Sequence, residues 1–134
     1  MEQAKEWSRK NGSFVTCWQE SWRAEDHYGL DNEESDDGWT YLWHGRPKKR
    51  CHRGSEGVGI FISPEAKAGW MDAGGDSEVN RLTYGNRILA TRINVEDSKG
   101  RKRRLFIASA YAPQYHDADE MDTFYESLQE CFDA

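Results

Sequence analysis

The 134-residue chain contains no long apolar run and no secretion signal, and these absences disfavour a membrane-spanning or a secreted protein. No apolar stretch approaches the roughly 18 residues that a membrane-spanning helix needs. Met1 to Glu6 lacks the basic start and apolar centre of a secretory signal. We therefore expect an intracellular protein without a membrane partner, in a reducing compartment; nucleus and cytoplasm are not distinguished.

Cysteines are few, and zinc-type spacing is missing. Cys17, Cys51 and Cys131 are an odd number without paired spacing, which predicts neither a disulfide framework nor a thiolate metal site. Free or buried thiols are expected instead. The four histidines lie in polar segments without the i, i+4 pattern of a zinc site, so zinc is not expected.

Apolar residues are scarce, but aromatic residues are not. The hydrophobic fraction is 37% and the charged fraction 31%, yet the aromatic content is 13% with six Trp. This aromatic content favours an ordered core over a disordered polyelectrolyte. A chain of this length buries roughly two-thirds of its unfolded surface, so one domain covering residues 1–134 is predicted.

The net charge of −6 hides two concentrated basic clusters. Cationic loops neutralise phosphates and release counterions, so both clusters are predicted to contact a nucleic-acid backbone. The alternative is that each is an ordinary solvated loop. The acidic stretch from Glu25 to Asp37 is interpreted as a solvated loop without a metal. The first cluster consists of Arg46, Lys48, Lys49, Arg50 and Arg53, and the second of Lys99, Arg101, Lys102, Arg103 and Arg104.

Local patterns predict helices at both ends of the chain. Glu2 to Lys10 is expected to be a short helix that Asn11-Gly12 terminates. Asp117 to Glu120 resembles a capping box, and apolar residues follow it at helical spacing, which predicts an amphipathic helix. These apolar residues are Met121, Phe124, Leu128, Cys131 and Phe132.

Strands are predicted between the two helices. Trp39 to Trp43 alternates with period two and places three aromatics on one face, a pattern more typical of core than of a ligand site. Ile88 to Val95 and Leu105 to Tyr111 read as a hairpin around the turn residues Asp97 to Gly100. Gly57 to Ser63 reads as a further strand that begins with glycine.

The segment Trp18-Gln19-Glu20-Ser21 closes the apolar run Phe14-Val15-Thr16-Cys17, which places Glu20 at the end of a predicted buried strand. A carboxylate in this place suits a metal ion, although a glutamate that merely ends a strand in water looks the same. The segment Leu105 to Pro113 likewise reads as a strand that ends in a tyrosine, Tyr111, and a proline stop, Pro113.

The order of these motifs resembles the endonuclease/exonuclease/phosphatase superfamily over nearly the whole chain. They are a strand ending in Gln-Glu, then Gly-Val-Gly-Ile, then a strand ending in Ala-Tyr-Ala-Pro. The sequences of Ser109 to Gln114 and Phe124 to Leu128 most resemble those of the endonuclease domains of non-LTR retrotransposons and of the craniofacial-development-protein-like group. Trp18 stands where the family usually has Leu, and Asn86 stands where this branch usually has Asp.

The resemblance implies an α+β fold, a partial four-layered α/β sandwich that is DNase I-like. The strands near Phe14, Trp39, Gly57, Ile88 and Leu105 are expected to form one mixed or antiparallel sheet backed by two helices. The second sheet of the sandwich is expected to be largely missing, because the chain lacks the segments that would form it. Its uncovered strand edges would favour self-association.

The resemblance also implies Mg²⁺-dependent cleavage of DNA, with Mn²⁺ as an alternative metal. Glu20 corresponds to the metal-binding glutamate, and Mg²⁺ needs only one or two protein carboxylates. Tyr111 corresponds to a tyrosine at the scissile phosphate, where a phenol donates a hydrogen bond. Arg87 is predicted to face a DNA phosphate, and an exposed turn arginine is the alternative.

No Asp-x-Asn or Ser-Asp-His motif with strand context occurs in the sequence, so no general base is identified. We expect an incomplete fragment with weak or no activity of its own. The alternative hypothesis is a non-catalytic remnant that binds nucleic acid or a protein. A third hypothesis is a phosphatase of small phosphoesters, which would share the fold; the sequence around Tyr111 disfavours it.

Overall fold

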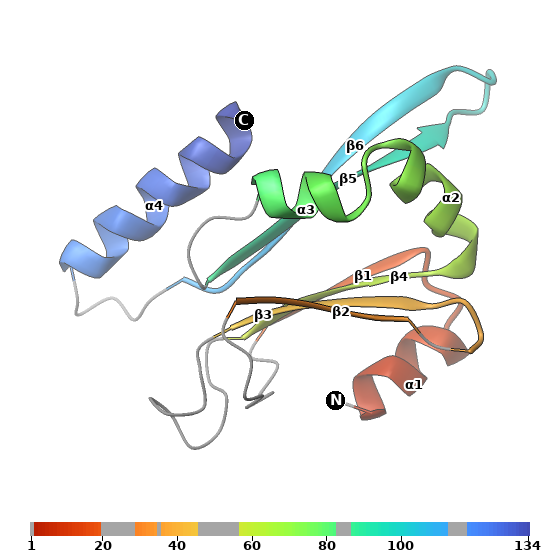
Figure 1. Ribbon diagram of the computed structural model, residues 1–134, viewed down its shortest axis with the longest axis horizontal. Helices are drawn as coiled ribbons and strands as arrows, with labels where there is room; N and C mark the ends of the chain where they lie inside the picture. Colours follow the sequence, from red (N-terminus) through yellow and green to blue (C-terminus); the bar gives the residue numbers. More distant parts are fainter. Residues whose placement is uncertain (1, 20–28, 35, 46–56, 83–86, 113–117) are drawn as a thin grey trace.

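The protein, described by a computed structural model, has an α+β fold with two antiparallel sheets (Figure 1). The structure describes residues 2–19, 29–34, 36–45, 57–82, 87–112 and 118–134. In chain order the elements are α1 (Glu2–Lys10), β1 (Val15–Gln19), β2 (Gly29–Glu34), β3 (Thr40–Gly45), β4 (Val58–Ile62), α2 (Pro64–Asp72), α3 (Asp76–Leu82), β5 (Ile88–Glu96), β6 (Lys102–Ala110) and α4 (Ala118–Asp133). The strand order is β1-β4-β3-β2 in the larger sheet, and β5 pairs with β6 in the smaller one. None of the described helices is long and apolar enough to cross a membrane.

One face of the four-stranded sheet is aromatic and lies against α1. Side chains alternate across a strand, so Trp39, Tyr41 and Trp43 share a face, where they pack with Phe61 of β4. The Tyr41 and Phe61 rings meet edge to face with their centroids 4.8 Å apart. Lys5 of α1 is buried here, and its ammonium lies 4.5 Å from the centre of the Tyr41 ring. The predicted aromatic core face is confirmed.

The opposite face of the sheet is aliphatic and packs against the β5–β6 hairpin. Leu42 of β3 joins Leu89 and Ile93 of β5 in one buried cluster. Trp70 of α2 completes this cluster, and its indole N–H donates a hydrogen bond of 2.8 Å to the Thr91 hydroxyl. The buried indole is therefore both packed and hydrogen-bonded.

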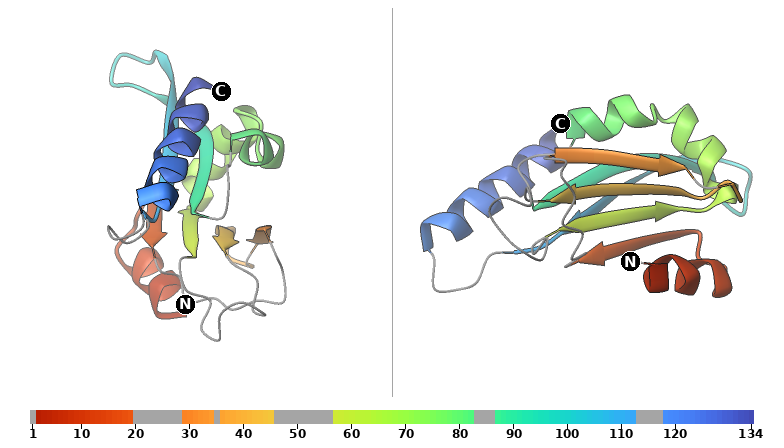
Figure 2. Two further views of the ribbon diagram at one scale, coloured as in Figure 1. Left: turned by 90° about the vertical axis from the view of Figure 1, so that its left-hand side faces the viewer. Right: turned by 60° about the horizontal axis from the view of Figure 1, so that its bottom comes forward.

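The other face of the hairpin is covered by α4. Ile88 and Ala90 of β5 are buried there with Phe124 and Cys131 of α4. The hairpin thus lies between α4 on one side and α2 with α3 on the other, above the larger sheet (Figures 1 and 2). Burial on both faces explains why β5 is apolar at consecutive positions.

Helix α2 lies very close to β5. It begins at Pro64, and the Ser63 hydroxyl caps it by accepting a hydrogen bond of 3.2 Å from the Ala66 amide. A Cβ atom at Gly69 would overlap the carbonyl oxygen of Asn94 in β5. Glycine at this position therefore permits the close approach of helix and strand.

The predicted single sheet is wrong, because β5 and β6 form a sheet of their own that packs face to face on the first. The second sheet was expected to be largely missing, and among the described residues it consists of these two strands. Two helices were expected, and the described residues form four. Helix α2 gives little signal in the sequence, because Ala66 and Trp70 are its buried positions and its pattern is only weakly amphipathic.

Strand β2 corrects the interpretation of Glu25 to Asp37 as a loop. Gly29–Glu34 pairs antiparallel with β3 over the whole length of the strand. It is the terminal strand of its sheet, and strands at such edges commonly carry charged residues. A polar edge strand lacks apolar alternation, so the hydrophobic pattern does not reveal it.

Elements set by local signals are confirmed. Helix α1 ends at Lys10, directly before Asn11-Gly12, and Gly12 has a φ of 62° that favours glycine. The hairpin pairs Ile88 with Ala110 and Glu96 with Lys102, around the expected turn. Helix α4 is amphipathic, and burial raises the pKa of its Cys131 thiol to about 11. This thiol is therefore a packing group.

Candidate functional site

The ends of β1 and β6 meet at one corner of the molecule. The Ser109 hydroxyl donates a hydrogen bond of 2.8 Å to the Trp18 carbonyl oxygen. The Gln19 side-chain amide donates a hydrogen bond of 2.5 Å to the Ala110 carbonyl oxygen. Each pair joins residues that are 91 positions apart in the sequence. The corner is therefore made by tertiary contacts between the two sheets.

This corner bears on the two predicted catalytic residues. Glu20 follows Gln19 directly in the sequence and lies outside the described residues. Tyr111 follows Ala110 directly and is partly buried against the aliphatic core. The structure brings together the residues that precede these two positions, and the roles assigned to Glu20 and Tyr111 stay predictions.

Arg87 lies at the same corner, where its side chain is only 9% exposed. One guanidinium nitrogen contacts a Glu120 carboxylate oxygen of α4 at 2.5 Å. Another donates a hydrogen bond of 3.3 Å to the Tyr111 carbonyl oxygen. The predicted contact of Arg87 with a DNA phosphate stays a prediction, and in this structure the guanidinium is paired with Glu120.

The described residues contain no group of three His, Cys, Asp or Glu side chains close enough to hold a metal ion. At the corner, the Glu120 carboxylate is already paired with Arg87. No described residue is therefore added to Glu20 as a predicted metal donor. One carboxylate is compatible with Mg²⁺, which usually keeps several of its waters.

The second basic cluster lies on the tip of the β5–β6 hairpin, which we call the arm (residues 96–104). Asp97 organises the turn by accepting hydrogen bonds of 2.9 Å from the amides of Lys99 and Arg101. Its other carboxylate oxygen accepts from Arg101 Nε at 2.9 Å and Arg103 Nε at 3.4 Å. The Arg101 amide contributes most to lowering the pKa of Asp97, and the Lys99 amide and both arginine side chains add to it.

All five cationic side chains of the cluster, Lys99, Arg101, Lys102, Arg103 and Arg104, are exposed. Arg104 also donates a hydrogen bond of 3.1 Å from Nε to Asn94 Oδ1, which orients it without neutralising it. The arm projects away from the larger sheet, beyond α2 (Figure 1). Its positive charge is therefore accessible to a large anionic partner. The first basic cluster, residues 46–53, lies outside the described residues.

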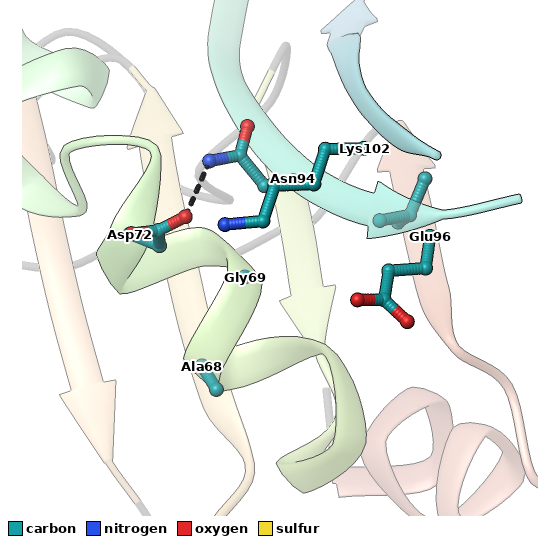
Figure 3. Close-up of a pocket in the computed structure, with 7 residues that line it drawn as sticks. Ala68, Gly69, Asp72, Asn94, Glu96 and Lys102 are labelled. Atoms are coloured by element: carbon teal, nitrogen blue, oxygen red, sulfur yellow. Dashed lines mark hydrogen bonds between the residues drawn. The ribbon is translucent and has the colours of Figure 1, made fainter. Parts of the chain in front are cut away.

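A pocket of about 400 Å³ lies between α2 and the base of the arm (Figure 3). Asp72 accepts a hydrogen bond of 2.8 Å from the Asn94 side chain at its wall. Glu96 and Lys102 also line the pocket, so the carboxylates and the ammonium give it mixed charge. Two carboxylates and one ammonium line this pocket, so it does not extend the basic surface of the arm.

Sequence reasoning missed Ser109 and Glu120 as parts of the corner. Ser109 lies inside the strand motif that ends at Tyr111, and Glu120 was interpreted only as part of a capping box. Each contacts a partner far away in the sequence, and Glu120 and Arg87 are 33 positions apart. No local sequence pattern predicts such a contact.

Comparison with known proteins finds no protein-family model, no curated protein and no solved structure that matches this chain.

Proposed function

We propose that this chain carries metal-anchoring and phosphate-binding parts of a DNase I-like domain that hydrolyses DNA phosphodiesters. The observation that carries the proposal is the corner made by the Gln19–Ala110 and Ser109–Trp18 hydrogen bonds. These contacts unite the strand ends that lead into Glu20 and Tyr111. Metal-assisted phosphodiester chemistry requires a metal ligand and phosphate-contacting donors close together.

The layering of the fold also supports this proposal. Helix α1, the four-stranded sheet, the hairpin and α4 follow one another as in a partial α/β sandwich (Figure 2). The arm adds an exposed positive surface on the same hairpin whose other end leads into Tyr111. A duplex bound along the hairpin would contact both regions.

Each part would have its own role. The Glu20 carboxylate would hold Mg²⁺, which supplies charge neutralisation at the phosphate when bound. The Tyr111 phenol would donate a hydrogen bond to a phosphate oxygen. The arm would grip the backbone through charge. No residue of the sequence is assigned as the general base, so the proposal assigns binding and metal anchoring to this chain.

Titration with Mg²⁺ tests the metal anchor. We expect NMR shifts on adding Mg²⁺ to the wild type and to Glu126→Gln, an exposed glutamate of α4 that serves as the matched control. Glu20→Gln should lose the response. An equal response in Glu20→Gln would contradict the proposal. Plasmid nicking with Mg²⁺ and with EDTA then measures whether the chain turns over DNA.

A nucleic-acid-binding module without catalysis is the second candidate, and the exposed arm favours it. The arm requires neither Glu20 nor a metal for its contacts. If DNA affinity is the same with Mg²⁺ and with EDTA, and is unchanged in Glu20→Gln, this second function is supported. A Mg²⁺-dependent affinity that Glu20→Gln abolishes favours the first.

A further inference from the structure

Arg87 holds Tyr111 from two directions. The Tyr111 amide donates a hydrogen bond of 2.9 Å to the Arg87 carbonyl oxygen, which extends the β5–β6 ladder one pair past Ile88 and Ala110. The Arg87 guanidinium returns a hydrogen bond of 3.3 Å to the Tyr111 carbonyl oxygen. The backbone of Tyr111 is thus held at both its amide and its carbonyl.

The same guanidinium also restricts the Tyr111 ring. Its central carbon lies 5.8 Å from the ring centroid, within the range of a cation–π contact. The ion pair with Glu120 fixes the guanidinium itself and ties it to the first turn of α4. An arginine can donate from separate nitrogens to Glu120 and to Tyr111 at once, whereas a lysine is a single charged point.

From these contacts we infer that Arg87 and Glu120 are positioning residues that hold Tyr111 in place for a phosphate. This inference rests on the proposed function, because it gives Tyr111 the phosphate-contacting role. The side chain of Arg87 is 9% exposed and pairs with Glu120, whose side chain is 35% exposed, so the pair would act on a bound phosphate through Tyr111. The deeply buried guanidinium distinguishes this assignment from a direct phosphate contact by Arg87.

The Arg87–Glu120 ion pair could also serve only to join the hairpin to α4. The test must therefore measure an effect on Tyr111 itself. The full chain is labelled with ¹³C at the tyrosine rings, and the Tyr111 signal is assigned with Tyr111→Phe. Ring resonances and the hydrogen-exchange rate of the Tyr111 amide are then measured in Arg87→Lys and in Glu120→Gln. The matched control is Arg92→Lys, which alters another arginine–carboxylate pair of the same strand, 3.0 Å from Glu78.

We expect the Tyr111 ring resonances to move in Arg87→Lys and in Glu120→Gln. Exchange of the Tyr111 amide should accelerate by about tenfold, as when one charge-assisted hydrogen bond is removed. Arg92→Lys should change neither quantity. Tyr111 signals in Arg87→Lys and Glu120→Gln that match those in Arg92→Lys would overturn the inference. If Arg87→Lys fails to fold, Glu120→Gln decides, because it keeps a neutral acceptor of similar shape.

A second measurement separates this inference from the proposed function. A short DNA duplex with Mg²⁺ is added to each protein, and the shifts of Tyr111 and of the arm amides are followed. Wild-type Tyr111 signals should move, and the movement should shrink in Arg87→Lys while the arm amides still respond. If wild-type Tyr111 does not respond to the duplex, the phosphate role of Tyr111 and the proposed function fail together. The exchange rates still test whether Arg87 and Glu120 hold Tyr111 in place. A Tyr111 response of wild-type size in Arg87→Lys would overturn the positioning role.

Discussion

Arg87 at the corner and Arg103 on the arm are both paired with a carboxylate, but their exposures differ. The side chain of Arg87 is 9% exposed, and that of Arg103 is 56% exposed. Exposed pairs contribute about 0–1 kcal/mol, whereas removing one partner of a buried pair costs about 3–5 kcal/mol. Burial, which the amino-acid type does not reveal, separates a cation that organises the fold from one that is accessible from solvent.

The largest expected effect is on stability at the corner. Arg87→Ala should lower the free energy of unfolding by about 3 kcal/mol, at the low end for buried pairs because Glu120 is partly solvated. The matched change Arg103→Ala should cost about 0.5 kcal/mol or less. Urea unfolding of both variants measures the difference. Similar losses in the two would remove the distinction between corner and arm.

DNA affinity should show the reverse ranking. Replacing Lys99, Lys102 and Arg104 with glutamine removes three charges and retains Arg101 and Arg103, the side-chain partners of Asp97. The slope of log K against log salt should fall by about 0.9 for each phosphate that the arm no longer neutralises, and the affinity at low salt by at least about tenfold. The control is Lys10→Gln, an exposed charge on α1. Fluorescence anisotropy with a labelled duplex measures both, and an unchanged salt slope would exclude the arm as a binding surface.

A smaller effect is expected from the hydrogen bond that joins the two sheets. Ser109→Ala removes the donor to the Trp18 carbonyl oxygen and should cost about 1 kcal/mol. Ser77→Ala removes an exposed hydrogen bond of 3.0 Å to Gly74 and should cost only a few tenths of a kcal/mol, as is usual at the surface. Thermal unfolding monitored by circular dichroism compares them. Equal costs would mean that the corner bond contributes no more than a surface bond.

The smallest effect concerns the conformation of the arm at acid pH. The pKa of Asp97 is lowered below its ordinary value of 3.8, so its carboxylate supports the turn at neutral pH. A lowered folded-state pKa gives support that is present above the unfolded value and is lost as the pH falls through the folded one. The amides of Lys99 and Arg101 should therefore shift together in NMR spectra below pH 3.8, and Asp97→Asn should abolish the transition. A midpoint above the ordinary value would contradict this assignment.

The predictability of each element follows from the range of the interactions that form it. Asp97 to Gly100 and the alternation of Ile88 to Val95 are local signals, so the sequence predicts the hairpin. It does not predict strand β2, because the stability of β2 comes from pairing with β3 and its own residues are polar. Helix α2 escapes prediction because Gly69 and Trp70 fit β5, a partner that no local pattern reveals.

In the candidate site, too, some features follow from the local sequence and others from tertiary contacts. The carboxylate after an apolar run and the tyrosine before a proline identify Glu20 and Tyr111 as candidates, and the resemblance names their chemistry. Their neighbourhood depends on Gln19 and Ser109, which reach across to the other sheet. Arg87 is the clearest example, because the local sequence would be the same for an exposed arginine in a turn and for a buried arginine that pairs with Glu120.

By itself, the amino-acid sequence determined the terminal helices, the hairpin and the basic charge of the arm. These depend on composition, turn residues and periodicities within a few positions. The tertiary structure decided that the hairpin forms a second sheet, that β1 and β6 end at one corner, and that Arg87 pairs with Glu120. Such contacts depend on which apolar faces pack together, and that choice is made by the whole chain when it excludes water from its core.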